Sequence, residues 1–350
     1  MNPPRRMNPP RRINILLHGR TVTHRGVGPD TYTNQLISAL SGRCIFGEFV
    51  GKNQSWQEWD VLHVLDMKHV SYKILKECPI PIVIDVHDTY WLEKIDYLCP
   101  DRCLRLWLNQ RRRKRYPKLL TRASKIVVHS LFVLNTLNEY LSDEHRQKVE
   151  LVPYSISVSE PSIDKLPTHS PRILFVGRDF FRKGFPTLID ALELLLKRQV
   201  DVQLRVVGQE YYHSLRWAKQ RCQKLPVSFL GGLNPQDLYH QILQSDVVVL
   251  PSYTEAFGIV LLEAQALGIP VVGSKVGGIP ETMADGHTGI LVPPNDPIAL
   301  ADALESLLKD DNRRQQMGEQ GKIWAQQHYL KSQIADALME LYNSMIISSS

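Results

Sequence analysis

The feature that most constrains this chain is an alternation of short apolar runs with amphipathic stretches, which occurs twice along its 350 residues. In the first half the apolar runs are rich in Val, Ile and Leu, which is typical of parallel strands covered on both faces. We expect these strands at 13–18, 61–65, 80–87, 125–130 and 149–153. The amphipathic stretches predict helices at 30–40, 71–78, 104–120 and 131–141. This succession indicates a doubly wound α/β domain.

The periodicity is lost between residues 154 and 171, where Ser, Pro, Thr and Asp predominate, and a second succession of the same kind follows. Because the chain is longer than one hydrophobic core usually supports, we expect two domains with ligands at the carboxyl ends of their strands. The predicted divisions are a disordered tail, a first domain, a second domain and a final helix that crosses to the first domain, at 1–12, 13–160, 161–325 and 326–350.

Targeting and redox signals are few. No apolar run reaches the roughly 18 to 20 residues that span a bilayer, and the first twelve residues lack an apolar stretch of signal-peptide type. The five cysteines are an odd number, which favours a reducing compartment such as the cytoplasm. Cys99 and Cys103 have no second pair at zinc-ligand spacing, so we expect no metal site.

A basic segment accounts for the positive charge. Residues 101–125 hold ten Lys and Arg against the single acid Asp101. Three interpretations are open: solvated helix charge, nucleic-acid binding, and binding of residues 104–125 to an anionic membrane surface, at the inner face of the plasma membrane. The apolar Leu104 and Trp107 beside the cations favour the membrane over nucleic acid, for which the sequence has no fold signature.

The strongest motif follows a buried strand of the second half. A short loop carries Glu255, and a helix is expected to open near Gly258, where the N–H groups of Phe257, Gly258 and Ile259 would form an anion site. On such a helix Glu263 lies roughly 12 Å and about 80° from Glu255, so both carboxylates can line one groove. The plainer alternative is a capping acid followed by a solvated glutamate.

This stretch, together with 271–281 and 285–293, closely resembles the retaining glycosyltransferases of family four. The resemblance extends from Gly177 to about Pro297 and implies the GT-B fold, in which two Rossmann-like domains face a central cleft and C-terminal helices pack back toward the first domain. It further implies transfer of a sugar from a UDP- or GDP-linked donor to a hydroxyl acceptor, a glycan or glycolipid of the cell envelope, with retention and without a metal. No cofactor is expected, since the nucleotide sugar is a substrate.

The resemblance also assigns residues. In that family the glutamate matching Glu255 faces the donor sugar, and the one matching Glu263 binds the ribose. Arg178 and Lys183 match the cations that hold the diphosphate, where two positive charges can replace a metal. His87, at a strand end, matches the histidine beside the transferred sugar. A solvated turn for Lys183 and a structural role for His87 are the plainer alternatives.

The remaining matches to the family are weaker, and two positions depart from its usual pattern. Gly26 and Gly28 resemble the glycine loop that approaches the donor phosphates, although Pro29 stands where the family usually has arginine. Tyr154 lies where the family commonly has Pro-Asn-Gly. Further residues follow strands at which the family places the nucleobase, namely Gly208, Gly231 and Leu233.

Other functions fit parts of the same pattern. A nucleotide-sugar epimerase or a sugar phosphorylase could share the fold, and a non-catalytic protein could retain the donor site. An NAD dehydrogenase is disfavoured, because neither Gly26-x-Gly28 nor the glycines at 273, 277 and 278 have the dinucleotide-binding spacing.

Overall fold

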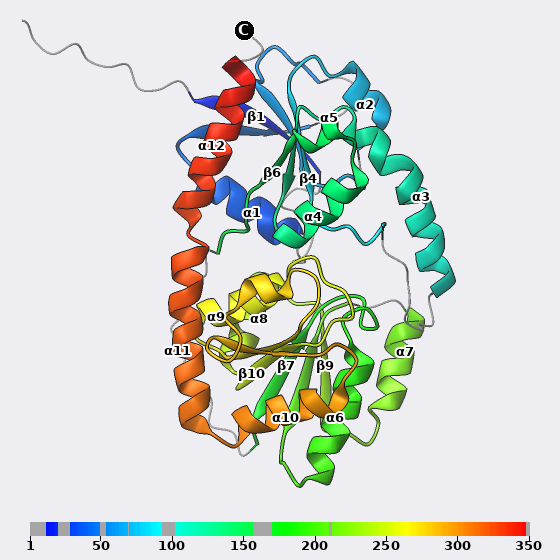
Figure 1. Ribbon diagram of the computed structural model, residues 1–350, viewed down its shortest axis with the longest axis vertical. Coiled ribbons are helices and arrows are strands. Elements are labelled where there is room, and N and C mark those ends of the chain that lie inside the picture. Colours follow the sequence, from blue (N-terminus) through cyan, green and yellow to red (C-terminus); the bar gives the residue numbers. More distant parts are fainter. Residues whose placement is uncertain are drawn as a thin grey trace, which may run out of the picture.

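The computed structural model describes residues 12–19, 29–49, 54–68, 70–92, 102–156, 170–209 and 212–347. They form two α/β domains, one above the other in Figure 1, each built on a six-stranded sheet. The expected fold class of two doubly wound domains is therefore confirmed. Residues 1–11 of the expected tail, Gly26, Gly28 and Cys99 lie outside the described residues.

The first sheet is parallel throughout and has the order β2-β1-β3-β4-β5-β6. Its strands are β1 (Ile13–His18), β2 (Cys44–Glu48), β3 (Val61–Val64), β4 (Ile82–Val86), β5 (Lys125–Val128) and β6 (Val149–Leu151). Its helices are α1 (Pro29–Ala39), α2 (Tyr72–Glu77), α3 (Arg102–Leu120), α4 (Leu131–Tyr140) and α5 (Asp143–Arg146). The sequence did not predict β2, which lies at the sheet edge and is only partly buried, so it lacks the apolar run of the inner strands.

The second sheet is also parallel and has the order β12-β11-β10-β7-β8-β9. Its strands are β7 (Arg172–Val176), β8 (Gln203–Val207), β9 (Val227–Gly231), β10 (Val247–Leu250), β11 (Val271–Ser274) and β12 (Gly289–Val292). Its helices are α6 (Phe185–Lys197), α7 (Tyr212–Arg221), α8 (Pro235–Leu243), α9 (Ile259–Ala266), η1 (Ile279–Thr282) and α10 (Pro297–Leu308). The strand order reverses between β7 and β10, and the loops that follow these two strands therefore meet at the topological switch point.

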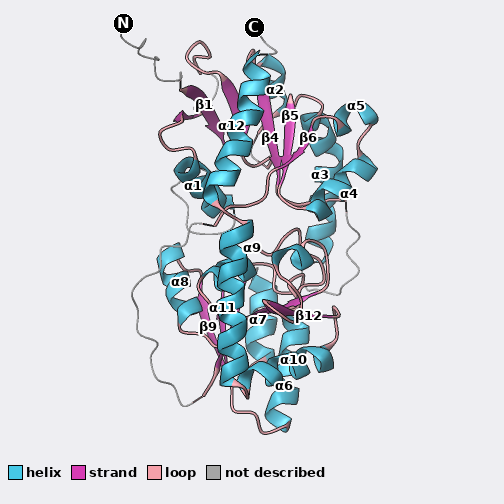
Figure 2. Ribbon diagram, turned by 60° about the vertical axis from the view of Figure 1, so that its left-hand side comes forward, coloured by secondary structure: helices cyan, strands magenta, loops and turns pink. Residues whose placement is uncertain are grey.

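Two C-terminal helices connect the domains. Helix α11 (Asp311–His328) packs against α9, and α12 (Lys331–Ile347) packs against α1 of the first domain, as both ribbon views show (Figures 1 and 2). Where α11 ends, the carbonyl of Tyr329 accepts a hydrogen bond from the N–H of Ile156, at 3.2 Å. The helices thus return the chain to the first domain beside the point where it left.

A buried polar chain fixes α12 to the first sheet. The hydroxyl of Tyr342 lies 2.7 Å from Nδ1 of His63, and Nε2 of the same ring lies 2.9 Å from Oδ1 of Asp85. Burial by itself would raise the pKa of Asp85, but His63 beside it holds that pKa below its ordinary value. The three side chains therefore form a continuous hydrogen-bonded chain in a place from which water is excluded.

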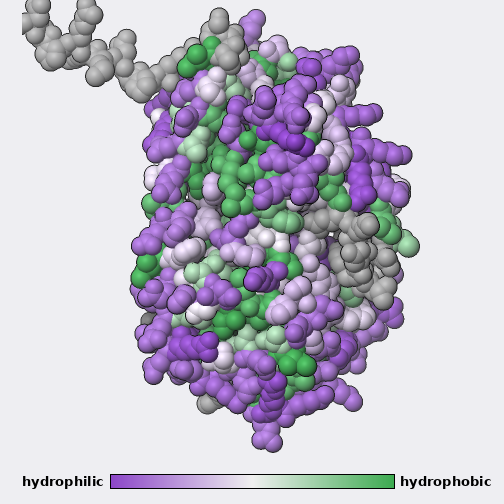
Figure 3. Space-filling view, in the orientation of Figure 1, coloured by the Kyte–Doolittle hydropathy of each residue, from purple (hydrophilic) through white to green (hydrophobic). Residues whose placement is uncertain are grey.

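The surface is mostly hydrophilic on the face seen in Figure 3, with hydrophobic side chains in small patches between the polar ones. Within the described ranges, none of the helices combines the length and the apolar character that a membrane span requires.

Candidate functional site

Two loops of the second domain come together at the switch point, one after β7 and one after β10. Gly184 has a φ of 70°, and a Cβ there would lie 1.7 Å from the carbonyl oxygen of Pro251. The N–H of Tyr253 donates to the carbonyl of Arg182 at 2.8 Å. Only glycine allows this approach, which brings the cations of the first loop to the carboxylate of the second.

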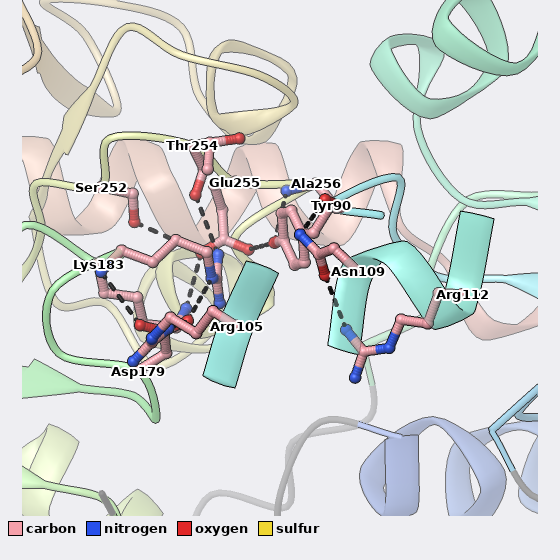
Figure 4. A network of polar contacts seen from close by, with 11 residues as sticks. Tyr90, Arg105, Asn109, Arg112, Asp179, Lys183, Ser252, Thr254, Glu255 and Ala256 are labelled. Atoms are coloured by element: carbon pink, nitrogen blue, oxygen red, sulfur yellow. Dashed lines mark hydrogen bonds and ion pairs between the residues drawn. The ribbon is translucent and has the colours of Figure 1, made fainter. Parts of the chain in front are cut away.

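Glu255 is the centre of the site. Its Oε2 accepts hydrogen bonds from Nζ of Lys183 at 2.7 Å and from Nη1 of Arg182 at 3.4 Å (Figure 4). Burial favours the neutral acid, but Lys183 and Arg182 outweigh it and lower the pKa of Glu255 to about 2. Burial lowers the pKa of Lys183, and the charge of Glu255 opposes that change. The carboxylate of Glu255 is thus ionised at neutral pH and accepts hydrogen bonds from both cations.

The first domain contributes Tyr90 to the same carboxylate. The Tyr90 hydroxyl donates to Oε1 of Glu255 at 2.7 Å and accepts from the N–H of Ala256 at 3.0 Å. Its ring lies under the guanidinium of Arg182, 4.1 Å from the ring centre. Figure 4 shows Tyr90 pointing at Glu255 from the opposite side to Lys183. The sequence analysis missed Tyr90, although it lies three residues after His87 at the same strand end.

A second contact between the domains lies on the other side of the loop. Arg105 of α3 forms an ion pair with Asp179, whose backbone has a φ of 63°. Asp179 also accepts from the N–H of Arg182 at 3.2 Å and from its Nε at 3.3 Å. Together with Lys183 and Glu255 this makes three cations and two carboxylates, so the cluster has a net positive charge that suits an anionic ligand.

Arg178 takes no part in this network. It lies two residues after the end of β7 and is exposed, whereas in the described part of the chain Arg182 and Lys183 are the cations seen on Glu255. No role had been assigned to Arg182 from the sequence. The role of Arg178 toward the diphosphate stays a prediction.

Helix α9 begins as the motif predicts. Gly258 caps it in the left-handed conformation, with a φ of 94°, and Ile259 is its first residue. Phe257, just before, is buried against Tyr154 of the first domain and Tyr329. The N-terminus of α9 therefore lies beside Glu255 at the boundary between the domains.

Glu263 is held inside the second domain rather than on its surface. It is 4% exposed and shares a hydrogen bond with the hydroxyl of Tyr239 on α8. Burial raises the pKa of Glu263 to about 7, against the small lowering effect of Tyr239. Glu255 and Glu263 therefore have opposite environments: cations surround Glu255, whereas Glu263 is buried with one tyrosine hydroxyl as its hydrogen-bond partner.

The residues expected near the nucleobase lie at the ends of β8 and β9, and Gly231 is the last residue of β9. The N–H of Gly208 donates to the carbonyl of Gly231 at 2.8 Å, which joins the two loops. Leu233 is half-buried and packs on the core beneath α8. Their role in binding a base stays a prediction.

His87 is engaged within the first domain. Its Nε2 lies 2.9 Å from the carbonyl of Leu65 and its Nδ1 lies 2.9 Å from the hydroxyl of Tyr154. A carbonyl accepts only, so Nε2 carries the proton and Nδ1 accepts from Tyr154. The departure at Tyr154 thus has a structural consequence, because this tyrosine orients His87 and packs on Phe257.

Asp85, His87 and His129 could offer three metal-ligand atoms within 4.8 Å of one another. However, both nitrogens of His87 are engaged, and Nδ1 of His129 donates to the carbonyl of Val152 at 2.8 Å. Burial, with a smaller effect of His87, lowers the pKa of His129 to about 3, so the ring is neutral. Asp85, His87 and His129 thus make their hydrogen bonds to other groups and not to one another. The expected absence of a metal stays a prediction.

The N-terminus of α4 also contacts the second domain. The carboxylate of Glu281 accepts from the N–H groups of Leu131 at 2.7 Å and Phe132 at 2.9 Å. Ser130, the capping residue, donates from Oγ to the carbonyl of Ala256 at 2.8 Å. A carboxylate from one domain thus caps a helix of the other.

Helix α3, the basic segment, has internal contacts that the sequence analysis did not consider. Besides the ion pair of Arg105, Arg113 donates to the carbonyls of Trp91 and Leu92, and Arg115 donates to those of Lys68 and Val70. At least three cations of α3 therefore contact other segments of the protein and are not simply solvated. The large apolar side chains that α3 exposes near its start are Leu104, Leu106 and Trp107.

Comparison with known proteins gives the context of this geometry. The model of the family described as Glycosyl transferases group 1 matches residues 159–324. The D-inositol 3-phosphate glycosyltransferase of Corynebacterium diphtheriae is 41% identical over 161 residues, which are 44% of this chain and 38% of the relative. That of Corynebacterium aurimucosum is 42% identical over 172 residues, 46% and 40% of the two chains. The chain thus spans about four tenths of the length of these curated relatives.

Solved structures match nearly the whole chain. The sucrose-phosphate synthase of Thermosynechococcus elongatus has a TM-score of 0.75 at 21% identity, covering 97% of this chain and 100% of that one. HepE of Anabaena in complex with UDP-glucose has a TM-score of 0.73 at 18% identity, covering 95% and 100%. WaaG, a glycosyltransferase involved in lipopolysaccharide biosynthesis, has a TM-score of 0.64 at 20% identity, covering 92% and 98%. At these identities the likeness establishes the fold, which is GT-B.

Proposed function

Because residues 159–324 of this chain belong to the glycosyl transferases group 1 family, we propose that the protein transfers a sugar from a nucleotide diphosphate donor to a hydroxyl acceptor. The observation that carries the proposal is the contact of Lys183 and Arg182 with Glu255 in the loop that leads into α9. Cations and the start of a helix are the groups that bind a diphosphate, and a carboxylate accepts hydrogen bonds from sugar hydroxyls.

The reaction proceeds with retention of configuration. The acceptor oxygen forms its bond to the anomeric carbon on the face from which the diphosphate oxygen departs, and that phosphate oxygen takes the acceptor proton. Arg178, Lys183 and the helix N-terminus at Gly258 stabilise the negative charge on the leaving group. Glu255 and His87 orient the sugar and its developing positive charge. Since protein cations and amides neutralise the diphosphate, the reaction needs no divalent ion and continues in the presence of a chelator.

The remaining donor contacts follow from the fold. We propose that Glu263 accepts hydrogen bonds from the ribose, while the loops that follow β8 and β9 surround the base. UDP- and GDP-linked sugars are the donors to test first. The neighbour crystallised with UDP-glucose supports the uridine nucleotide.

The acceptor lies on the side of the first domain. A glycan or a lipid-linked glycan of the cell envelope is our proposal, and the neighbour involved in lipopolysaccharide biosynthesis supports it. The name of the matched relatives adds D-inositol 3-phosphate as a polyol acceptor to be tested.

Helix α3 provides a surface for an anionic membrane at the cytoplasmic face. The exposed Leu104, Leu106 and Trp107 can enter the head-group region while Arg111, which stacks on Trp107 at 4.6 Å, stays among the phosphates. Flotation with vesicles of anionic lipid should carry the protein upward, and Trp107→Ser should weaken this. Equal flotation with purely zwitterionic vesicles would contradict the electrostatic part.

The function is tested by the release of UDP or GDP from their sugars in the presence of an acceptor panel. Glu255→Ala and Lys183→Ala should each slow turnover by about a hundredfold or more. Lys197→Ala, an exposed lysine at the end of α6, is the matched control and should turn over normally. Near wild-type rates in both site variants would contradict the assignment.

Two further readouts separate the rival functions. NMR of the donor without acceptor would reveal epimerisation as a change in the sugar signals. A protein that only binds would show donor binding but release no nucleotide with any acceptor.

A further inference from the structure

Tyr90 has an unusual set of partners for a tyrosine of the first domain. Its hydroxyl donates to Oε1 of Glu255 at 2.7 Å and accepts from the N–H of Ala256 at 3.0 Å, and both partners belong to the second domain. A hydroxyl that can donate one hydrogen bond and accept another is also the group that a sugar carries on most of its carbons.

The carboxylate of Glu255 and the N–H of Ala256 can together bind only one oxygen at this position. The N–H of Ala256 has a single hydrogen, and the Tyr90 oxygen already lies at hydrogen-bonding distance from it and from the carboxylate. A second oxygen that bonded to both atoms would have to occupy the same place. A ligand hydroxyl at this point and the Tyr90 hydroxyl therefore exclude each other.

We propose that Tyr90 occupies the place of one donor-sugar hydroxyl when no donor is bound, and that the sugar binds by displacing it. The inference rests on the proposed function, in which Glu255 faces the donor sugar. Tyr90 then keeps the buried carboxylate and the amide satisfied in the ligand-free protein, at the expense of affinity for the donor.

The backbone around Tyr90 is held by α3. Nδ2 of Asn109 donates to the carbonyl of Tyr90 at 3.0 Å, and Arg113 donates to the carbonyls of Trp91 at 2.6 Å and Leu92 at 2.8 Å. The hydroxyl therefore leaves Glu255 by rotation of the side chain or by movement of the first domain as a body, without local unfolding.

The test is Tyr90→Phe, which removes the hydroxyl but keeps the ring beneath Arg182. Calorimetry would measure the Kd of UDP, UDP-glucose, GDP and GDP-mannose for wild type and variant. A competing hydrogen bond to a charged group corresponds to a change of about tenfold or more. The sugar nucleotide that binds wild type should therefore bind the variant about tenfold more tightly, while the affinity for the nucleotide without sugar stays the same. Tyr72→Phe, an exposed tyrosine on α2, should change neither.

The other outcomes are equally informative. Unchanged or weaker binding of the sugar nucleotide by Tyr90→Phe overturns the proposal, because Tyr90 would then be a fixed part of the site. An equal gain for nucleotide and sugar nucleotide also overturns it, because the diphosphate and not the sugar would displace Tyr90. If neither protein binds any of the four ligands, the proposed function itself fails, and the displacement fails with it.

Discussion

Arg105 of the first domain and Asp179 of the second form an ion pair with little exposure, 8% and 21% for the two side chains. Asp179 simultaneously accepts two hydrogen bonds from Arg182, the cation that faces Glu255. The pair therefore links the position of α3 to the conformation of the loop that carries Lys183. The contact between the domains and the arrangement of these cations are linked through it.

Arg105→Ala should destabilise the protein by about 2 kcal/mol, because Asp179 loses a largely buried partner. It should also weaken the binding of UDP or GDP, because the loop that carries Lys183 then loses its ion pair with α3. Urea denaturation and calorimetry check both effects. Lys114→Ala, an exposed cation on the same helix, is the control, and equal effects in the two variants would contradict the coupling.

Glu263 should make stability depend on pH. Burial raises its pKa to about 7 from an ordinary 4.5, so the folded protein retains a proton that the unfolded chain releases. The stability contribution of this group therefore falls as pH rises between these two values and is constant above them. Glu263→Gln should stabilise the protein by up to about 3 kcal/mol at pH 8, and by less than about 1 kcal/mol at pH 5.

Denaturation at the two pH values measures this difference. Glu319→Gln, an exposed glutamate on α11, should give no such pH dependence. If Glu263 binds the ribose, Glu263→Gln should also weaken nucleotide binding while it stabilises the fold. A variant with the same pH profile as wild type would show that the acid is ionised in the folded state.

Tyr342→Phe should weaken the attachment of α12 to the first sheet. It removes the partner of His63 Nδ1 in the buried chain that ends at Asp85, and an unsatisfied buried group costs about 1 to 3 kcal/mol. Hydrogen exchange should be faster along α12 than in wild type. Tyr140→Phe, an exposed tyrosine, should leave both stability and exchange unchanged, and slow exchange along α12 in Tyr342→Phe would be evidence against this anchor.

Glu281→Gln should weaken the contact between α4 and the second domain. The carboxylate accepts from two N–H groups at the start of the helix, whereas an amide turns an NH2 group toward one of them. We expect a loss of about 1 kcal/mol and a larger radius of gyration by small-angle scattering. Glu340→Gln, at an exposed site on α12, is the control. An unchanged radius of gyration in Glu281→Gln would show that this contact does not hold the two domains together.

The sequence predicted those parts of the molecule that depend on local pattern. Buried parallel strands have continuous apolar runs, so most strands were placed to within two residues, while the partly exposed edge strand β2 was missed. The resemblance placed Lys183 and Glu255 at one donor site but did not predict their contact, which arises because the loops after β7 and β10 flank the switch point.

Contacts between the domains could not be derived in the same way. Tyr90 and Arg105 reach Glu255 and Asp179 only because the domains have one relative orientation, which no local pattern encodes. The proximity of Tyr90 to the strand-end His87 was a usable signal. Nothing in the sequence indicates that Arg105, one cation in a run of many, is buried.

The hydrogen bond between Ile156 and Tyr329 places the outgoing and the returning chain side by side. Two chain segments that are joined at one place allow the domains to rotate about that place. They oppose translation of one domain along the other. A ligand that enters between the domains therefore meets the same side chains whenever this rotation brings the domains together. Residues as distant in sequence as Tyr90 and Glu255 can consequently come together at one place.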